Sequence, residues 1–281
     1  MSGRSSWLSL AWPMLAASAW LGLAVAAPAP SANFAQQNSG VTEVDVELAL
    51  AVDISFSMDP EEQELQREGY IRAITSNEFL RAVKDGVRRK IAMTYFEWAN
   101  YSERKVIAPW RLIDGPEAAD AFAAEIARAL YRRASRTSIS GALEFGAALF
   151  DNSGYKGLRR VIDVSGYGAN NNGPLIVAMR DAVLAKGIVI NGLPIMLKVP
   201  IGSGMDIDHL DIYYEDCVVG GPGAFVIPIR DRAKFREATR TKLVQEVASR
   251  PAEPRVMPAS ASVPRISCTI GEQIWQQRWG N

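Results

Sequence analysis

The sequence of 281 residues has little of what hydrolytic, redox and zinc sites require. It contains two cysteines and one histidine, His209, so it lacks both a C-x-x-C redox motif and the ligands of a structural zinc site. It also lacks a G-x-S-x-G nucleophile motif and a Walker-type phosphate-binding loop. The sequence therefore favours a protein that is not an enzyme, and an uncharacterised hydrolase stays a third alternative.

The sequence also lacks an excess of charge of either sign. Lys+Arg and Asp+Glu both total 31, and no basic run with interleaved aromatic residues occurs. Nothing in this balance favours nucleic acid or an anionic membrane surface as a partner. With 48% hydrophobic and 22% charged residues, the composition is that of an ordinary globular protein with a substantial core.

The N-terminus is typical of an export signal. Arg4 provides a positive region, residues 7–23 are mostly apolar, and Ala24-Val25-Ala26 fits a small-residue cleavage site. We expect a signal peptide over residues 1–26, a small and polar linker over 27–43, and a periplasmic or extracellular location. The alternative is an uncleaved membrane anchor, which would be the chain's one contact with a membrane.

Export changes the interpretation of the two cysteines. In an oxidising compartment Cys217 and Cys268 are expected to form a disulfide, with two buried free thiols as the alternative. The crosslink would close a loop of about 50 residues and stabilise the fold by about 4 kcal/mol in the chain-entropy account. Residues 250–281 are a proline-rich linker and a tail with Trp275 and Trp279, which we expect the disulfide to dock.

One stretch places three oxygen-bearing side chains close together. Residues 44–52 have the pattern of a buried strand, and Asp53, Ser55 and Ser57 follow at spacings of two. Asp59 and the proline and two acids after it are a helix start. A curled loop would offer only hard oxygen ligands, which select Mg²⁺, Mn²⁺ or Ca²⁺ over zinc. The alternative is that D-x-S-x-S is a common pattern of a strand-to-helix turn.

The rest of the sequence alternates predicted strands and helices. Strands are expected at 44–52, 90–98, 102–109, 159–164, 187–195 and 224–229, and helices at 59–75, 76–86, 115–134, 140–150, 174–186 and 231–249. This order predicts an α/β fold with a doubly wound, mostly parallel sheet flanked by helices and one antiparallel edge strand. In such sheets ligands bind beyond the carboxyl ends of the strands, where the Asp53 loop falls.

Four segments together resemble the von Willebrand factor type A (VWA) superfamily: residues 53–57, 136–143, 161–171 and 217–225. The resemblance covers residues 44–249 and is closer to an exported bacterial branch of unknown function. It implies a VWA-like domain with a metal-ion-dependent adhesion site (MIDAS), whose signature is D-x-S-x-S. It also implies a further hydroxyl ligand at Thr137, five residues before an Ala-Leu pair. The alternative role for Thr137 is to cap the next helix.

The sequence departs from the family at one position of this site. Where relatives carry a second acid the chain has Tyr167, and a neutral phenol is a poor ligand for Mg²⁺ at neutral pH. One of the asparagines at 170–172 would partly fill the gap. Asp163 would lie about 13 Å away along the strand and needs a buried partner such as a hydroxyl, a lysine or an arginine. We expect metal binding that is weaker than in relatives, or absent.

The function that follows from the resemblance is recognition. A cation held by Asp53, Ser55, Ser57 and Thr137 keeps an open coordination position for an Asp or Glu of a protein partner. We therefore expect an exported binding or adhesion domain with Mg²⁺ or Mn²⁺ at a partly degenerate site. The alternative is a metal-free domain with a structural or assembly role.

Overall fold

The structure is a computed structural model of the chain, and it describes residues 41–197, 207–248 and 264–279. The expected signal peptide at 1–26, the linker as far as residue 40 and the proline-rich linker from residue 250 to 263 lie outside the described residues. Within the described ranges, no helix has the length and apolar character that a membrane span requires.

Five strands form one sheet in the order β3-β2-β1-β4-β5. The strands are β1 (Thr42–Asp53), β2 (Ile91–Trp98), β3 (Arg104–Ile113), β4 (Tyr155–Gly166) and β5 (Ile188–Pro194). β1 pairs in parallel with β2 and β4, β4 pairs in parallel with β5, and β3 pairs antiparallel with β2 at the edge. The predicted fold class, a mostly parallel sheet with one antiparallel edge strand, is confirmed.

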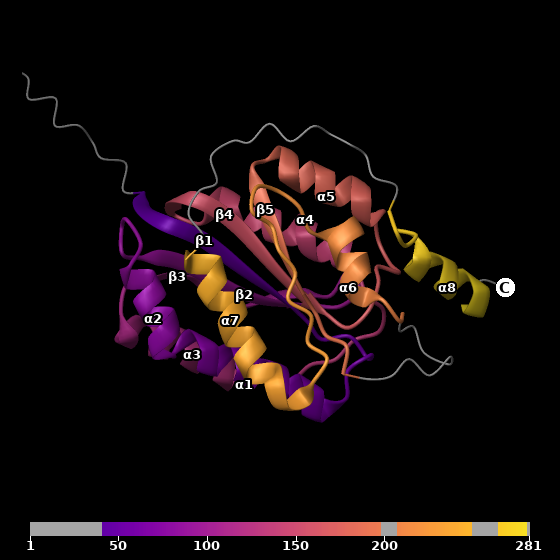
Figure 1. Cartoon of the computed structure of the whole chain (residues 1–281), viewed down its shortest axis with the longest axis horizontal. Coiled ribbons are helices and arrows are strands. Elements are labelled where there is room, and N and C mark those ends of the chain that lie inside the picture. The colour runs from indigo at the N-terminus through magenta and orange to yellow at the C-terminus, as the bar shows by residue number, and fades with distance from the viewer. Residues whose placement is uncertain (1–40, 198–206, 249–263, 280–281) are drawn as a thin grey trace, which may run out of the picture. The chain divides into compact units, whose positions relative to one another are not determined.

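Helices cover both faces of the sheet (Figure 1). On one face lie α1 (Pro60–Ile74), α2 (Asn77–Lys84), α3 (Pro116–Arg128) and α7 (Phe235–Ala248), which follows the short 3-10 turn η3 (Arg232–Lys234). On the other face lie α4 (Ile139–Leu149), η1 (Phe150–Asn152), α5 (Ile176–Ala185), α6 (Leu210–Tyr213) and the π-helical turn η2 (Tyr214–Val218). The last helix is α8 (Ile270–Trp279).

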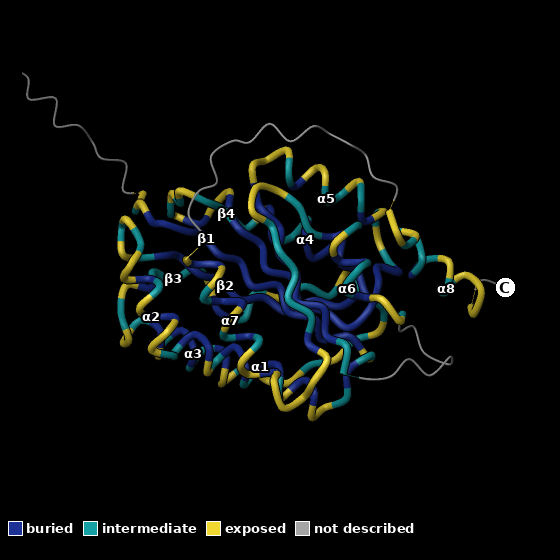
Figure 2. Tube along the Cα trace, in the orientation of Figure 1, coloured by how far each residue is buried: buried dark blue, intermediate teal, exposed yellow. Residues whose placement is uncertain are grey.

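The central strand β1 shows why the chain forms two cores. Leu48 and Leu50 point into the core under α1 and α7, while Ala49 and Ala51 point into the core under α4. Successive side chains of a strand face opposite sides, so a strand in the middle of a covered sheet is buried on both. Figure 2 shows this as continuous burial along the inner strands.

The predicted helix at 115–134 is wrong at its C-terminal end, because α3 ends at Arg128. The next carbonyl groups are bound by side chains of α1 instead of by a further helical turn. Arg67 donates to the Ala129 oxygen at 2.5 Å, and Gln63 donates to the Arg132 oxygen at 2.5 Å. Tertiary contacts thus override the helix propensity of this alanine- and arginine-rich stretch.

The predicted strand at 224–229 is also wrong. The segment runs beside β5, but it forms only the isolated bridges of Val226 with Gly192 and of Ile229 with Ile195. The Gly192 and Met196 amides donate to the Phe225 and Ile229 oxygens, but Pro194 of β5, which lies between them, has no amide hydrogen and so interrupts the ladder. The sheet therefore ends at β5.

Candidate metal centre

Three of the four predicted ligands converge at the carboxyl end of β1. The Asp53 carboxylate accepts hydrogen bonds from the Ser55 amide at 2.7 Å and from Ser55 Oγ at 3.1 Å. Ser55 Oγ lies 2.6 Å from Ser57 Oγ. The capping box between Asp59 and Glu62 starts α1 directly after this loop. One carboxylate and two hydroxyl oxygens therefore meet between the end of β1 and the start of α1.

The carboxylate of Asp53 is fully buried. Burial raises its pKa from 3.8 to about 6, and the hydrogen bonds from Ser55 and from the Tyr167 amide oppose this rise. Removing a carboxylate from water disfavours its ionised form unless a positive charge compensates. A cation at this position would supply that charge.

The loop that carries Thr137 lies against the Asp53 loop. The Phe56 amide donates to the Ala134 oxygen at 2.9 Å, and the Ala134 amide donates to the Ile54 oxygen at 3.2 Å. Thr137 itself is buried, and its Oγ1 lies beside Gly168, 3.7 Å from where a Cβ at that glycine would be. The two loops are therefore joined by backbone pairing, although no side-chain bond links Thr137 to the three converging oxygens within the described chain.

The alternative role of Thr137 as a helix cap is not realised. The N-cap of α4 is Ser138, whose hydroxyl accepts from the Gly141 amide at 3.2 Å. Thr137 instead exchanges backbone hydrogen bonds with Asn171: its amide donates to Asn171 Oδ1 at 2.9 Å, and its oxygen accepts from the Asn171 amide at 2.9 Å. The Thr137 hydroxyl is thus not used for capping.

Tyr167 contributes a hydrogen-bond donor where the family resemblance places an acid. Its backbone amide donates to Asp53 Oδ2 at 3.2 Å. Its side chain is buried in the core under α1, where burial first, and then the acids Glu62, Asp53 and Asp59, raise the pKa of the phenol well above 10. The phenol stays neutral at physiological pH and is no substitute for a carboxylate.

The asparagines beyond Tyr167 connect the loop after β4 to neighbouring loops. Asn170 Oδ1 accepts from the Ser140 amide at 3.0 Å, Asn171 Oδ1 from Thr137, and Asn172 Oδ1 from the Tyr101 amide at 2.8 Å. Each of these amide oxygens already accepts one backbone amide hydrogen, and the expectation that one of them replaces the missing acid stays a prediction. They fix the loop after β4 to its neighbours.

Asp163 has the buried partner that its position requires. It is fully buried on β4, and its Oδ1 lies 2.8 Å from Nζ of Lys242 on α7. Lys242 also lies 2.5 Å from Glu246 Oε1, and Asn191 Nδ2 donates to Glu246 Oε2 at 2.6 Å. The expected lysine partner is confirmed, and Asp163 belongs to the sheet–helix interface instead of the candidate metal site.

Two parts of the site escaped the sequence analysis. Arg67 is buried, binds Glu97 at 2.6 Å and holds the loop after α3, which in turn pairs with the Asp53 loop. Helix α8 packs against the loop after β4, where Glu272 accepts a hydrogen bond of 2.8 Å from Asn170 Nδ2. Neither contact has a local sequence signal, because each joins segments that are far apart in the chain.

The donor set fits a small hard cation. Among the described residues no group of three or more His, Cys, Asp and Glu side chains is placed to hold a metal ion. A site at Asp53 would therefore rely on one carboxylate together with hydroxyl oxygens, the ligand type that Mg²⁺ and Mn²⁺ accept. A hollow of about 940 Å³ at the opposite end of β1, lined by Asp45, Val46 and Arg81 among others, includes none of these ligands.

A family model described as "Protein of unknown function (DUF1194)" matches residues 43–251. The chain belongs to this family. The matched part of the DUF1194 chain includes every candidate ligand and Cys217, whereas α8 and Cys268 lie beyond it. A comparison with curated proteins found no match.

Solved structures similar to the DUF1194 chain have VWA-like folds. They include proximal thread matrix protein 1 from the mussel byssus with a zinc-occupied MIDAS motif (12% identity, TM-score 0.53, 74% of this chain and 49% of that one). They also include a von Willebrand factor type A protein from Catenulispora acidiphila (15% identity, TM-score 0.50, 73% of this chain and 43% of that one). A third is the pilus adhesin SpaC from Lactobacillus rhamnosus GG (10% identity, TM-score 0.54, 73% of this chain and 31% of that one). The DUF1194 chain spans about half or less of the length of these proteins. At such identities the likeness shows the fold, which is VWA-like.

Proposed function

We propose that the protein is an exported binding or adhesion domain that recognises a protein partner through a divalent cation. Asp53, Ser55, Ser57 and Thr137 would hold Mg²⁺ or Mn²⁺. The observation that carries this proposal is the convergence of the Asp53 carboxylate with two serine hydroxyls at the carboxyl end of β1. This edge of a parallel sheet is where VWA-like and other doubly wound folds bind ligands.

When bound, the cation supplies an open coordination position that a partner's Asp or Glu can fill. The chain's own residues set how well it is held. Asp53 is the one acid of the set, and Tyr167 presents a backbone amide hydrogen to it in place of a second acid. We therefore expect a weaker site than one with two carboxylates.

The surface around the site supports a protein partner. Phe56, Leu130 and Tyr131 are large apolar side chains that are more than half exposed, at 59%, 84% and 55%. The Arg133 guanidinium lies 5.3 Å from the centre of the Phe56 ring, and a hollow of about 470 Å³ opens beside Tyr131 and Arg133. Exposed apolar and arginine side chains grouped at one place are typical of protein-binding surfaces.

The named relatives agree with a recognition role. Proximal thread matrix protein 1 has a MIDAS motif occupied by zinc, and SpaC is described as a pilus adhesin. The exposed position of the single histidine, His209, ahead of α6 also supports a role other than hydrolysis. Export rests on the signal-like pattern of residues 1–26.

A Mn²⁺ titration of the purified full-length chain tests the metal site. We expect saturable binding in the wild type, its loss in Asp53→Ala and its weakening in Ser57→Ala. Ser135→Ala is the matched control, because it removes an exposed hydroxyl from the neighbouring loop. Retention of wild-type affinity in Asp53→Ala, checked for folding by circular dichroism, would show that Asp53 does not hold the ion.

A metal-free structural domain is the second candidate, and one observation favours it. Ser55 and Ser57 bond to each other, and the Asp53 oxygens accept hydrogen bonds from Ser55 and Tyr167, so this loop is satisfied without an ion. Capture of envelope proteins with and without EDTA discriminates between the two candidates. A partner that is retained in EDTA and by Asp53→Ala would support the structural role.

A further inference from the structure

Helix α8 makes close contact with the loop that follows β4. A Cβ atom at Gly271 would lie 2.1 Å from the Asn170 carbonyl oxygen, so only glycine allows this approach. The next residue, Glu272, accepts a hydrogen bond of 2.8 Å from Asn170 Nδ2. The start of α8 therefore contacts both the backbone and the side chain of Asn170.

The loop that contains Asn170 is hydrogen-bonded to the segment that carries Thr137. Asn170 Oδ1 accepts from the Ser140 amide at 3.0 Å, and Asn171 exchanges two backbone-directed hydrogen bonds with Thr137. Displacing Asn170 would disturb the first turn of α4 and, through Asn171, the backbone of Thr137. The contact thus extends from α8 to a candidate ligand without any of the α8 residues touching the ligand.

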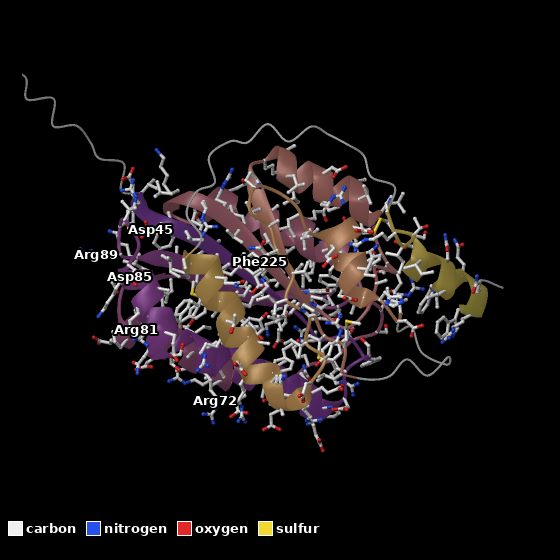
Figure 3. All side chains as sticks on the ribbon, viewed as in Figure 1. Asp45, Arg72, Arg81, Asp85, Arg89 and Phe225 are labelled. Carbon is white, nitrogen blue, oxygen red and sulfur yellow. A yellow bond between two sulfur atoms is a disulfide. The ribbon has the colours of Figure 1, made fainter. Side chains whose placement is uncertain are left out.

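The attachment of α8 includes one covalent bond. Gly271 is its only buried residue within Ile270–Trp279. Cys268, just before α8, forms a disulfide with Cys217 of the buried turn η2 (Figure 3). Ile266 and Ile270 pack half-buried against the core under α4, and Arg265 pairs with Glu215 at 2.6 Å and with Asp216 at 2.7 Å. The Arg136 guanidinium lies 3.8 Å from the centre of the Trp275 ring. The disulfide is therefore the covalent link among half-buried and exposed contacts that hold α8 against the loop.

We propose that α8 is a redox-sensitive clamp that positions the Thr137 segment for cation binding. The inference rests on the proposed function for its effect on the ion, but the clamp itself is a property of the loops. A dithiol reductant would transfer two electrons and two protons to the disulfide, leaving thiols at Cys217 and Cys268 and becoming a disulfide itself. Attack falls on the Cys268 sulfur, because Cys268 is half-exposed and Cys217 is buried.

Opening the disulfide frees α8 from Asn170, and the hydrogen bonds that Thr137 and Ser140 donate to the asparagines weaken as a result. These two amides are direct reporters, because an amide exchanges its hydrogen when its local hydrogen bond opens. Reduction should therefore loosen the metal site while the sheet stays intact.

The experiment compares the full-length wild type with Cys217→Ser/Cys268→Ser, and with Gly271→Ala, which keeps the disulfide but forces α8 off Asn170. We expect amide hydrogen exchange at Thr137 and Ser140 to accelerate about tenfold or more in both variants. Amides of β1 and β4 should exchange as in the wild type. We further expect the Mn²⁺ dissociation constant to rise at least about fivefold in both variants. Gln277→Ala, an exposed change on α8, should alter neither quantity.

Unchanged exchange at Thr137 and Ser140 in Gly271→Ala and in the double serine variant would overturn the clamp. Faster exchange with unchanged Mn²⁺ affinity would overturn its link to the metal site. If the wild type binds no Mn²⁺, the proposed function fails, and the exchange rates still decide whether the clamp exists. If amides of β1 and β4 also exchange faster in the double serine variant, the exchange rates of Gly271→Ala alone decide whether the clamp exists.

Discussion

The backbone amide of Tyr167 donates a hydrogen bond of 3.2 Å to Asp53 Oδ2. The loop after β4 thus contributes a hydrogen-bond donor, the Tyr167 amide, to the candidate metal site. Among the four candidate ligands, Asp53 is the one that carries an acid. A site of this kind has half the acidic charge that the VWA resemblance leads one to expect. The electrostatics of Asp53 therefore decide whether a cation binds.

Replacing Tyr167 by aspartate should strengthen cation binding. The variant Tyr167→Asp supplies a second carboxylate near Asp53, and we expect Mn²⁺ affinity to rise by about tenfold or more because each added ligand charge strengthens the site. Calorimetric titration measures the change. Tyr167→Phe is the control, since it keeps the ring in the core and adds no charge. A folded Tyr167→Asp with no gain would mean that position 167 does not face the ion.

Cation affinity should depend on pH in a defined window. Burial raises the pKa of Asp53 from 3.8 to about 6, and the ion needs the ionised carboxylate. We expect Mn²⁺ affinity to increase as the pH rises through about 6 and to level off above it. Titrations at a series of pH values between about 5 and 8 measure this dependence. Affinity that is flat across about pH 6 would contradict the involvement of Asp53.

The stability of the metal-free chain should show the opposite trend. Between pH 3.8 and about 6 the folded chain keeps a proton on Asp53 that the unfolded chain has released. The contribution of Asp53 to the free energy of unfolding therefore falls as the pH rises through this window, by up to about 3 kcal/mol. Urea unfolding of the wild type and of Asp53→Asn measures it, because asparagine does not titrate. Equal pH profiles for the two proteins would contradict the raised pKa.

Arg67 should be needed for the position of the loop after α3. It pairs with buried Glu97 and donates to the Ala129 oxygen. Arg67→Leu leaves Glu97 buried without its cation, and we expect a loss of about 3–5 kcal/mol in the free energy of unfolding. Arg72→Leu, on the exposed face of the same helix, should cost less than about 1 kcal/mol. Similar losses in the two variants, measured by urea unfolding, would argue against this role.

Lys242 should stabilise the interface between β4 and α7. Burial lowers its pKa, but the carboxylates of Asp163 and Glu246 outweigh burial and raise it overall, so the lysine stays charged. Its Nζ also lies 4.8 Å from the centre of the Phe225 ring, which Figure 3 labels beside α7. Lys242→Met leaves Asp163 and Glu246 buried without their cationic partner, and we expect a loss of about 3–5 kcal/mol in the free energy of unfolding.

Lys234→Met is the matched control for that change, because Lys234 is exposed at the start of the same helical region. It should leave the urea midpoint within experimental error of the wild type. A Lys242→Met protein as stable as this control would show that Asp163 and Glu246 are neutral in the folded chain. Burial raises the pKa of each acid overall, and Lys242 opposes this rise.

Much of the fold was predictable because local pattern and tertiary structure agree. β1 and α1 follow from a run of apolar residues and from the cap at Asp59, and the structure contains both. Element ends were not predictable from sequence where side chains of distant segments bind backbone groups. The helix predicted to reach residue 134 ends at Arg128 because Arg67 and Gln63 bind the carbonyls that would continue it.

The candidate site was predictable to a similar degree. The spacing of Asp53, Ser55 and Ser57 places their oxygens together because all three lie on one short turn. The contact of Thr137 with Asn171 and the contact of Gly271 with Asn170 join separate turns. No local pattern encodes such pairings, so they became visible only once the loops were placed side by side.

The convergence of oxygens at the end of β1 is tested most directly by Mn²⁺ electron paramagnetic resonance, which reads free and bound ion in one titration. The account predicts saturable binding by the full-length wild type at pH above about 7, lost in Asp53→Ala and weakened in Ser57→Ala. No bound Mn²⁺ at any concentration, or the same binding in all three folded proteins, would contradict it.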